Sequence, residues 1–244
     1  MIRPTKKTIV LFTSRILDAL LPRHCVLCGQ ASTGSNLCGP CAAELPRPDH
    51  TCRMCGLPLT SVHDWICGVC LHKPPAWDRA VAAFAYRFPV DQLVLRFKFS
   101  RSLACGEVLG RELLAAVLSS EAPLPECIIP VPLHKTRLFL RSFNQADLLA
   151  GMVGKQLGIP VIRGVLRRTR NTQAQSGLAA ASRKKNIRGA FSCCPLEDLA
   201  QAVHIGLVDD VCTTGETLAA CTRTLKAAGA ERVTVWVAAR APPP

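Results

Sequence analysis

The stretch from Ile205 to Thr217 carries the residue types best suited to chemistry. An apolar run that ends at Val208 is followed by Asp209 and Asp210, and a threonine- and glycine-rich segment then opens a helical pattern. Adjacent carboxylates at the end of a buried strand are costly unless they face water, a cation or hydroxyl donors. Glycine and hydroxyl residues at a helix start expose backbone N–H groups, and the helix dipole adds positive charge there. The pattern predicts a phosphate cradle beside a carboxylate pair rather than an ordinary capped turn.

Eight cysteines form four Cys-x-x-Cys pairs in the first third of the chain. Such a turn places two thiolates on the same side of a tight loop, and Gly29 and Gly56 follow two of these turns, where a missing Cβ eases the backbone bend. Two pairs supply four thiolates, which suits tetrahedral Zn²⁺. The first set is Cys25, Cys28, Cys38 and Cys41, and the second is Cys52, Cys55, Cys67 and Cys70. We predict two closed, structural zinc sites, and the sequence leaves open whether neighbouring pairs join or interleave.

Few large apolar residues lie between Cys25 and Cys70, so burial alone could not hold this stretch together. Metal binding would then supply folding free energy, and a chelator is expected to unfold the stretch. Three histidines lie nearby and are interpreted as surface residues rather than ligands: His24, His63 and His72. The remaining six cysteines are scattered, unlike those of a secreted disulfide scaffold.

Composition and charge limit the classes of protein that the chain can represent. Its 244 residues are 49% hydrophobic and 19% charged, which suits one α/β core with a small appended module and excludes a disordered protein. The net charge of +13 favours anionic partners, the alternative being a generally basic surface. No apolar window is long enough to span a bilayer, and no cleavage site follows the apolar N-terminal stretch. We expect a cytoplasmic protein without a membrane span.

Periodicity predicts an α/β domain that follows the cysteine-rich module. Apolar runs alternate with helical patterns from Ala76 onward, and this alternation predicts a parallel sheet covered on both faces. Ligands bind such sheets at the carboxyl ends of the strands. Strands are expected over 79–86, 127–131, 159–166, 202–208 and 232–239, and helices within 90–118 (two, with a break near Ser100), 143–157 and 216–228. The expected regions are an amphipathic helix in 1–22, a double zinc ribbon in 23–75 and the α/β domain in 76–244.

The loop that begins at Asp209 resembles the phosphoribosyl pyrophosphate (PRPP) signature of type I phosphoribosyltransferases. The resemblance extends over nearly the whole chain and narrows to the ComF/GntX family of competence-associated proteins. Besides the cysteine pairs, it is carried by a block from Ile129 to Lys135, by Arg141-Ser142-Phe143-Asn144-Gln145-Ala146, and by a stretch from Gln175 to Arg183 with Asn186. The family usually has glycine where this chain has Ser142. If that position needs a positive φ, the turn is strained or rearranged.

The resemblance implies a type I phosphoribosyltransferase fold joined to an N-terminal double zinc ribbon. It implies that Asp209 and Asp210 hold the ribose hydroxyls of PRPP, directly or through Mg²⁺. The implied 5′-phosphate ligands are Thr213, Thr214, Gly215, Glu216 and Thr217. The implied pyrophosphate ligands are Val131, Pro132, Leu133, Lys135, Arg137 and Arg183. The polar, basic segment 167–177 would be a flexible hood over the substrate, the alternative being a solvated loop.

Two functions remain open from the sequence. A transferase would displace pyrophosphate from C1 of PRPP by a nucleophile, through an oxocarbenium-like transition state. No general base stands out near the signature, so neither catalysis nor the acceptor is assigned. The family's link to DNA uptake in natural transformation implies an alternative: a non-catalytic nucleic-acid-binding or scaffold protein, with single-stranded DNA and a competence helicase as partners. Basic residues between Arg163 and Arg188 favour phosphate contacts, whereas an aromatic content of 5% argues against a dedicated single-strand reader.

Overall fold

A computed structural model describes residues 23–60, 65–170, 189–194 and 204–242. The predicted N-terminal amphipathic helix, Arg183 and residues 171–177 of the expected hood lie outside these ranges. The chain divides into two compact units, Met1–Leu45 and Pro46–Pro244, so that each Cys-x-x-Cys set belongs to a different unit. Among the described residues, none of the helices has the length and apolar character needed to cross a membrane.

The first unit is built around a short hairpin and one helical turn. Strands β1 (Arg23–His24) and β2 (Ala31–Ser32) pair in antiparallel register, and helix α2 spans Gly39–Ala43. The N–H of Gly29 donates to the Cys25 carbonyl (2.9 Å), which closes the turn between the first two cysteines. The unit therefore brings its four cysteines together with very little regular structure.

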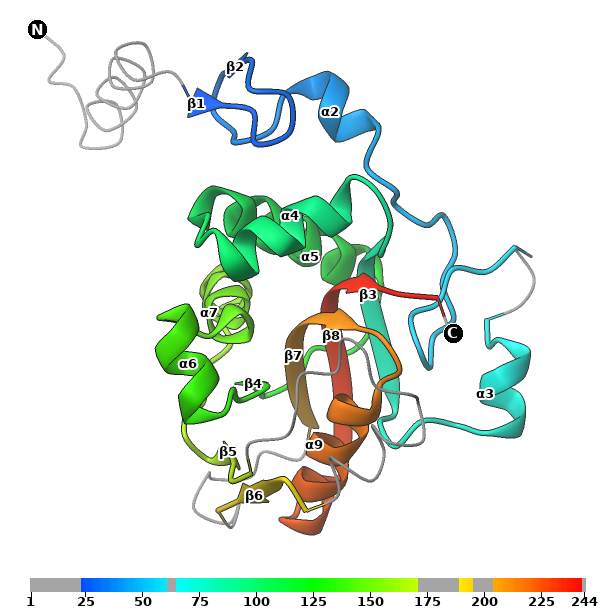
Figure 1. The fold of residues 1–244 in the computed structure, drawn as a ribbon. Helices are drawn as coiled ribbons and strands as arrows, with labels where there is room; N and C mark the ends of the chain where they lie inside the picture. The colour runs from blue at the N-terminus through cyan, green and yellow to red at the C-terminus, as the bar shows by residue number, and fades with distance from the viewer. Residues whose placement is uncertain (1–22, 61–64, 171–188, 195–203, 243–244) are drawn as a thin grey trace, which may run out of the picture. The chain divides into compact units, whose positions relative to one another are not determined.

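A four-stranded parallel sheet forms the centre of the second unit, in the order β3–β8–β7–β4 (Figure 1). The strands are β3 (Arg79–Ala85), β4 (Cys127–Pro130), β7 (His204–Cys212) and β8 (Arg232–Arg240). Successive side chains point to opposite faces of a strand, and both sets are buried along β8. Burial on both faces is typical of a parallel sheet between two helical layers, so the predicted α/β class is confirmed.

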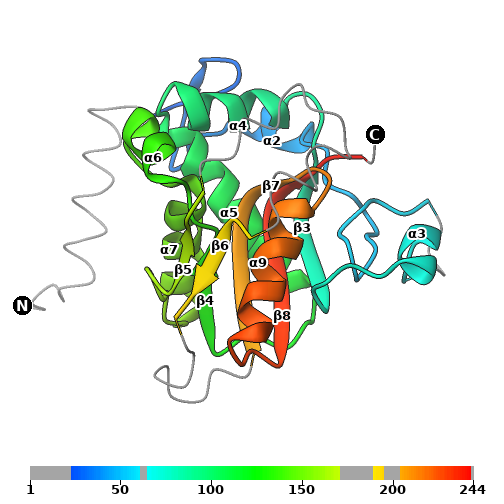
Figure 2. The same ribbon diagram turned by 60° about the horizontal axis from the view of Figure 1, so that its bottom comes forward.

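Helices cover both faces of this sheet (Figure 2). On one side lie α4 (Val90–Phe99), α5 (Leu103–Ser119) and α7 (Gln145–Leu157), while α9 (Glu216–Ala227) covers the other. Leu218 and Leu225 of α9 share a core with Val233 and Val235 of β8. The unit also contains two short helices, α3 (Gly68–His72) and α6 (Lys135–Arg141). The break predicted near Ser100 separates α4 from α5.

The structure differs from the predicted strands in two places. The strand predicted over 159–166 is not continuous: between Ile159 and Val165 only Val161 pairs, as an isolated bridge to Ile128, because Pro160 lacks an N–H donor and Val161 packs against Gly154 of α7. Pairing begins at β5 (Leu166–Arg168), which is antiparallel to β6 (Phe191–Cys193). The strand predicted to end at the aspartates continues as β7 to Cys212, because β8 pairs alongside it as far as Arg240.

Candidate ligand cleft and metal centres

Two clusters of four cysteine Sγ atoms are present among the described residues. Within each cluster all four sulfur atoms lie within 4.8 Å of one another. One cluster is Cys25, Cys28, Cys38 and Cys41, and the other is Cys52, Cys55, Cys67 and Cys70. Each cluster is therefore formed by two Cys-x-x-Cys pairs that follow one another in the sequence, which excludes the interleaved pairing. Four convergent thiolates are the donor set of a closed structural zinc site, so the chain has two structural zinc centres.

The two centres differ in their surroundings. In the second, Cys52, Cys55 and Cys70 are buried, and they pack with a small group of apolar side chains: Met54, Leu57, Leu59 and Ile66. In the first, only Cys25 is buried, and Cys28 is exposed. The second centre thus has an apolar core in addition to its metal ligands.

A cleft of about 740 Å³ lies at the carboxyl ends of the strands in the second unit. Most residues implied by the PRPP signature line it: Val131, Pro132, Leu133, Arg137, Asp209, Asp210, Thr213, Thr214, Gly215, Glu216 and Thr217. Lys135 is not among the lining residues; it is exposed at the start of α6. Segments distant in the sequence therefore meet at one cavity.

An ion pair between partly buried Lys98 and buried Asp210 lies in the acidic wall of this cleft. Lys98 Nζ lies 2.8 Å from Asp210 Oδ1, and the N–H of Asp210 donates to Asp209 Oδ1 (2.8 Å). Burial raises the pKa of Asp209, and the charge of Asp210 raises it further, whereas Lys98 and Arg168 oppose the shift. The sequence analysis missed Lys98, although its position four residues after buried Val94 places it beside the apolar stripe of α4.

The loop between β7 and α9 lines the same cleft. Gly215 has a φ of 77° and is the N-cap of α9, so the helix begins at this cleft. A Cβ atom at Gly215 would lie 2.8 Å from the Trp77 ring, and only glycine meets both constraints. Thr214 Oγ1 is buried and has no hydrogen-bond partner among the described residues. The loop therefore offers a helix N-terminus and a hydroxyl to a bound group.

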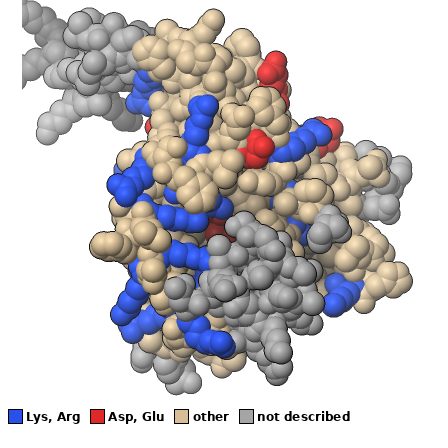
Figure 3. Space-filling view, in the orientation of Figure 1, with Lys and Arg blue, Asp and Glu red and all other residues tan. Residues whose placement is uncertain are grey.

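Four guanidinium groups border the cleft, those of Arg101, Arg137, Arg141 and Arg168. Burial lowers the pKa of Arg137, and the nearby charge of Arg141 adds to this effect. Burial also lowers the pKa of Arg168, with a contribution from the charge of Arg137. Like charges held this close together create positive potential, which attracts anions. Figure 3 shows Lys and Arg gathered on this face around a recessed acidic spot.

The loop after β4 is held by the motif that follows it. The Val131 N–H donates to the Val208 carbonyl (2.9 Å), and Asn144 Nδ2 donates to the Val131 carbonyl (3.0 Å). Asn144 also caps α7 through the N–H of Ala146. Ser142, at the end of α6, has a φ of 69°. The turn thus keeps the left-handed conformation that glycine favours, at a cost of about 1 kcal/mol for serine.

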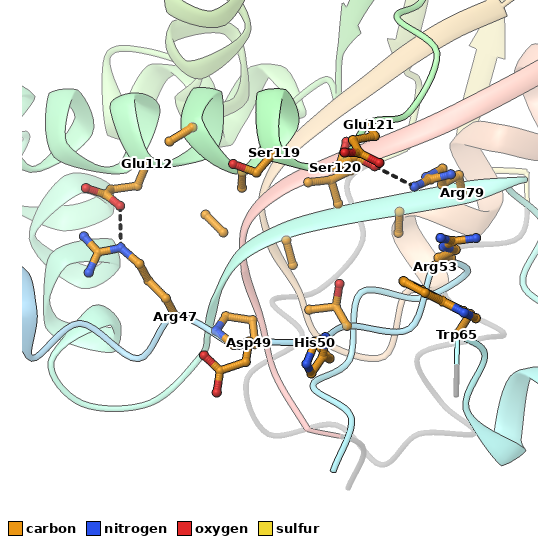
Figure 4. A pocket seen from close by; sticks show the side chains of 18 residues that line it. Arg47, Asp49, His50, Arg53, Trp65, Arg79, Glu112, Ser119, Ser120 and Glu121 are labelled. Atoms are coloured by element: carbon orange, nitrogen blue, oxygen red, sulfur yellow. Dashed lines mark hydrogen bonds and ion pairs between the residues drawn. The ribbon is translucent and has the colours of Figure 1, made fainter. Parts of the chain in front are cut away.

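A second cavity of about 520 Å³ lies between β3, α5 and the segment from Arg47 to Arg53 (Figure 4). Arg47 Nε lies 2.8 Å from Glu112 Oε2, and Arg53 stacks over the Trp65 ring at 3.7 Å. Acidic and basic side chains are balanced in its lining: Arg47, Arg53 and Arg79 against Asp49, Glu112 and Glu121. None of the implied ligand residues lies here, and the cavity lacks the basic excess of the first cleft.

The site and fold define an α/β protein with a parallel sheet, a ligand cleft at its strand ends and a double zinc ribbon. Residues 16–71 match the family model of the double zinc ribbon domain. Competence protein F of Haemophilus influenzae is 36% identical over 224 residues, which cover 89% of this chain and 97% of that protein. The DNA utilization protein YhgH of Salmonella typhi is 38% identical, over 90% and 98% of the two chains. The chain therefore belongs to the ComF family of competence and DNA utilization proteins.

Among solved structures, the chain is similar to an adenine phosphoribosyltransferase from Trypanosoma brucei. The TM-score is 0.33 and the identity 14%, with 57% of this chain and 54% of the other covered. A likeness this remote carries no conclusion about ligands or activity.

Proposed function

We propose that the cleft at the strand ends binds a phosphoribosyl group, as PRPP with Mg²⁺. The observation that carries the proposal is the meeting of the Asp209–Asp210 pair and the Gly215 loop in one cavity bordered by guanidinium groups. A carboxylate pair suits sugar hydroxyls, and a helix N-terminus suits a phosphate. Few ligands other than a phosphorylated sugar carry both groups at such close range.

Different parts of PRPP contact different residues of the cleft. The carboxylates of Asp209 and Asp210 accept hydrogen bonds from the ribose hydroxyls, with Lys98 holding Asp210 in place. The 5′-phosphate accepts from the loop N–H groups and from Thr214 Oγ1, whose buried hydroxyl otherwise lacks a partner among the described residues. The pyrophosphate lies toward the loop after β4, where Arg137 and Arg168 supply positive charge.

The oxygen donors of the cleft fit Mg²⁺, which prefers carboxylate and phosphate oxygens. Lys98 already balances one negative charge of the Asp209–Asp210 pair, so the phosphates of PRPP would contribute much of the coordination. When bound, Mg²⁺ would neutralise charge on a departing pyrophosphate. The candidate reaction is displacement of that pyrophosphate by an acceptor nucleophile.

Calorimetry with PRPP and Mg²⁺ tests the proposal. We expect Asp209→Asn/Asp210→Asn to weaken binding by tenfold or more, since each lost hydrogen bond to a charged group is worth about 1.5–3 kcal/mol. Glu112→Gln, which removes a carboxylate from the other cavity, is the matched control and should bind as wild type does. Absence of binding to wild type at millimolar PRPP, or equal binding by the double variant, would refute the proposal.

The pH dependence adds a second readout. Because the pKa of Asp209 is raised to about 7, its carboxylate becomes a full acceptor only as the pH rises through that value, and PRPP affinity should rise with it. The same shift means that ionisation of Asp209 destabilises the folded state above its ordinary pKa. Asp209→Asn alone should therefore leave thermal stability unchanged or higher, so that lost binding is not lost folding.

The names of the relatives favour a second candidate function, contact with DNA. Three described residues of the basic stretch are exposed: Arg163, Arg167 and Arg170. Arg163 already pairs with Asp147 (2.6 Å), and Arg167 Nε donates to the Gly164 carbonyl (2.8 Å). A gel-shift series against salt with single-stranded DNA should show a steep slope that Arg163→Ala/Arg167→Ala reduces. A shallow slope, or no effect of the substitutions, would exclude these residues as phosphate contacts.

A further inference from the structure

The turn from Cys52 to Cys55, called here the second zinc knuckle, presents three successive backbone carbonyls to β3, to β8 and to Trp77, which precedes β3. The carbonyl of Arg53 accepts from the N–H of Ala80 at 2.9 Å. The carbonyl of Met54 accepts from Trp77 Nε1 at 2.5 Å, and that of Cys55 accepts from Arg240 Nε at 3.0 Å. Three successive residues of the turn that carries two metal ligands are therefore hydrogen-bonded to the α/β part of the same unit.

Two of these three donors also contact the segment from Cys212 to Thr217, which is called here the anion loop. Arg240 Nη1 donates to the carbonyls of Cys212 (3.0 Å) and Thr213, and to that of Ala241 at 2.6 Å. The Trp77 ring packs so closely on Gly215 that the loop has no room for a Cβ atom there. One side chain from the last strand and one from the residues before β3 thus connect the zinc knuckle to the loop.

Because Arg240 is buried, its guanidinium group depends on the backbone carbonyls that accept its hydrogen bonds. Only 7% of the residue is exposed, and among the described residues no carboxylate forms an ion pair with it. A buried guanidinium satisfied by carbonyls depends on all of them, because each lost acceptor leaves a charged donor without a partner. Displacement of the Cys55 carbonyl would therefore disturb the group that also holds Cys212 and Thr213.

The metal ligands fix the position of those carbonyls. The N–H of Cys67 donates to Cys52 Sγ (3.3 Å), and the N–H of Gly56 donates to the Cys52 carbonyl (2.8 Å). With four thiolates on one ion, the knuckle has a single conformation, whereas without an ion the cysteines take up protons and lose the bonds that hold the two Cys-x-x-Cys turns together.

We propose that Arg240 and Trp77 are positioning residues that couple the second zinc centre to the anion loop. The loop from Cys212 to Thr217 is shaped for a phosphate only while the Cys52–Cys70 centre holds its metal. The inference rests on the proposed function for the identity of the bound group, but the coupling itself does not depend on PRPP.

Hydrogen exchange of the full chain separates the two ideas. Arg240→Met should speed amide exchange in residues 212–217 at least tenfold, with or without PRPP, and should weaken PRPP binding at least tenfold. Arg240→Lys, which reaches fewer carbonyls than the guanidinium fork, should give an intermediate result. Trp77→Phe keeps an aromatic side chain but removes the donor to Met54 and the outer ring atoms that pack on Gly215, so it provides a second variant if Arg240→Met fails to fold.

Matched cysteine variants test the role of the metal. Cys52→Ser/Cys55→Ser should speed exchange of the loop, whereas Cys25→Ser/Cys28→Ser should leave it unchanged, with zinc content measured by atomic absorption in each. If wild type ignores PRPP while loop exchange still depends on Arg240 and Cys52, the proposed function fails and the coupling stands. If PRPP binds to wild type and to every variant alike, and loop exchange stays the same, the coupling is refuted.

Discussion

The two zinc centres share their ligands and their Cys-x-x-Cys turns, yet their surroundings differ. The first lies in a unit with one helical turn and a hairpin whose two strands have two residues each, and its Cys28 is exposed. The second has three buried cysteines, an apolar cluster around them and a row of carbonyls bonded to the sheet. Identical motifs therefore serve as a self-contained fold in one place and as part of a ligand domain in the other. The motif specifies the metal; the packing around it specifies what the metal supports.

The largest test of this comparison is loss of each metal centre in turn. Cys52→Ser/Cys55→Ser should lower the main unfolding temperature in calorimetry by about 5 °C or more, because it removes buried ligands and the carbonyl row together. Cys25→Ser/Cys28→Ser should unfold only the first unit and leave that transition in place. Equal effects of the two double variants on the main transition would contradict the difference drawn between the centres.

A smaller effect on stability is expected at the glycine that follows the first Cys-x-x-Cys turn of each zinc centre. Gly29 and Gly56 have φ values of 78° and 71°, so alanine at either position costs about 1 kcal/mol in the left-handed region. A Cβ atom at Gly56 would also lie 3.2 Å from Ala82 Cβ, whereas no described atom lies within 4 Å of the same point at Gly29. Urea unfolding should show a larger loss for Gly56→Ala than for Gly29→Ala. The reverse order would mean that the second knuckle is not held tightly against β3.

The features that sequence analysis predicted correctly depend on patterns among neighbouring residues. They are the two sets of four cysteines and the alternation of strands and helices. The helix boundaries at Gly158 and the break near Ser100 were predictable for the same reason, since capping and helix-breaking residues act locally.

The missed residues depend on which strands become neighbours. Trp77 and Arg240 meet the loop because β8 lies between β3 and β7, and no local pattern encodes that order. Lys98 meets Asp210 only once α4 packs beside the end of β7. Arg168 belongs to a stretch predicted as a hood, but it lies in β5, whose partner β6 is distant along the chain. The αL conformation of Ser142 was anticipated only through the family resemblance, because serine itself carries no signal for a positive φ.

The position of β8 has a consequence for the order of folding. Each zinc centre closes over a short stretch of chain, so it can form while the remainder is still being synthesised. The sheet cannot do so, because β3 has β8 as its sheet neighbour, and most of the second unit separates these two strands along the chain. Contacts of such long range form slowly. In a nascent chain the zinc centres would therefore form before β8 is synthesised, and Arg240 would connect the second centre to the cleft only later.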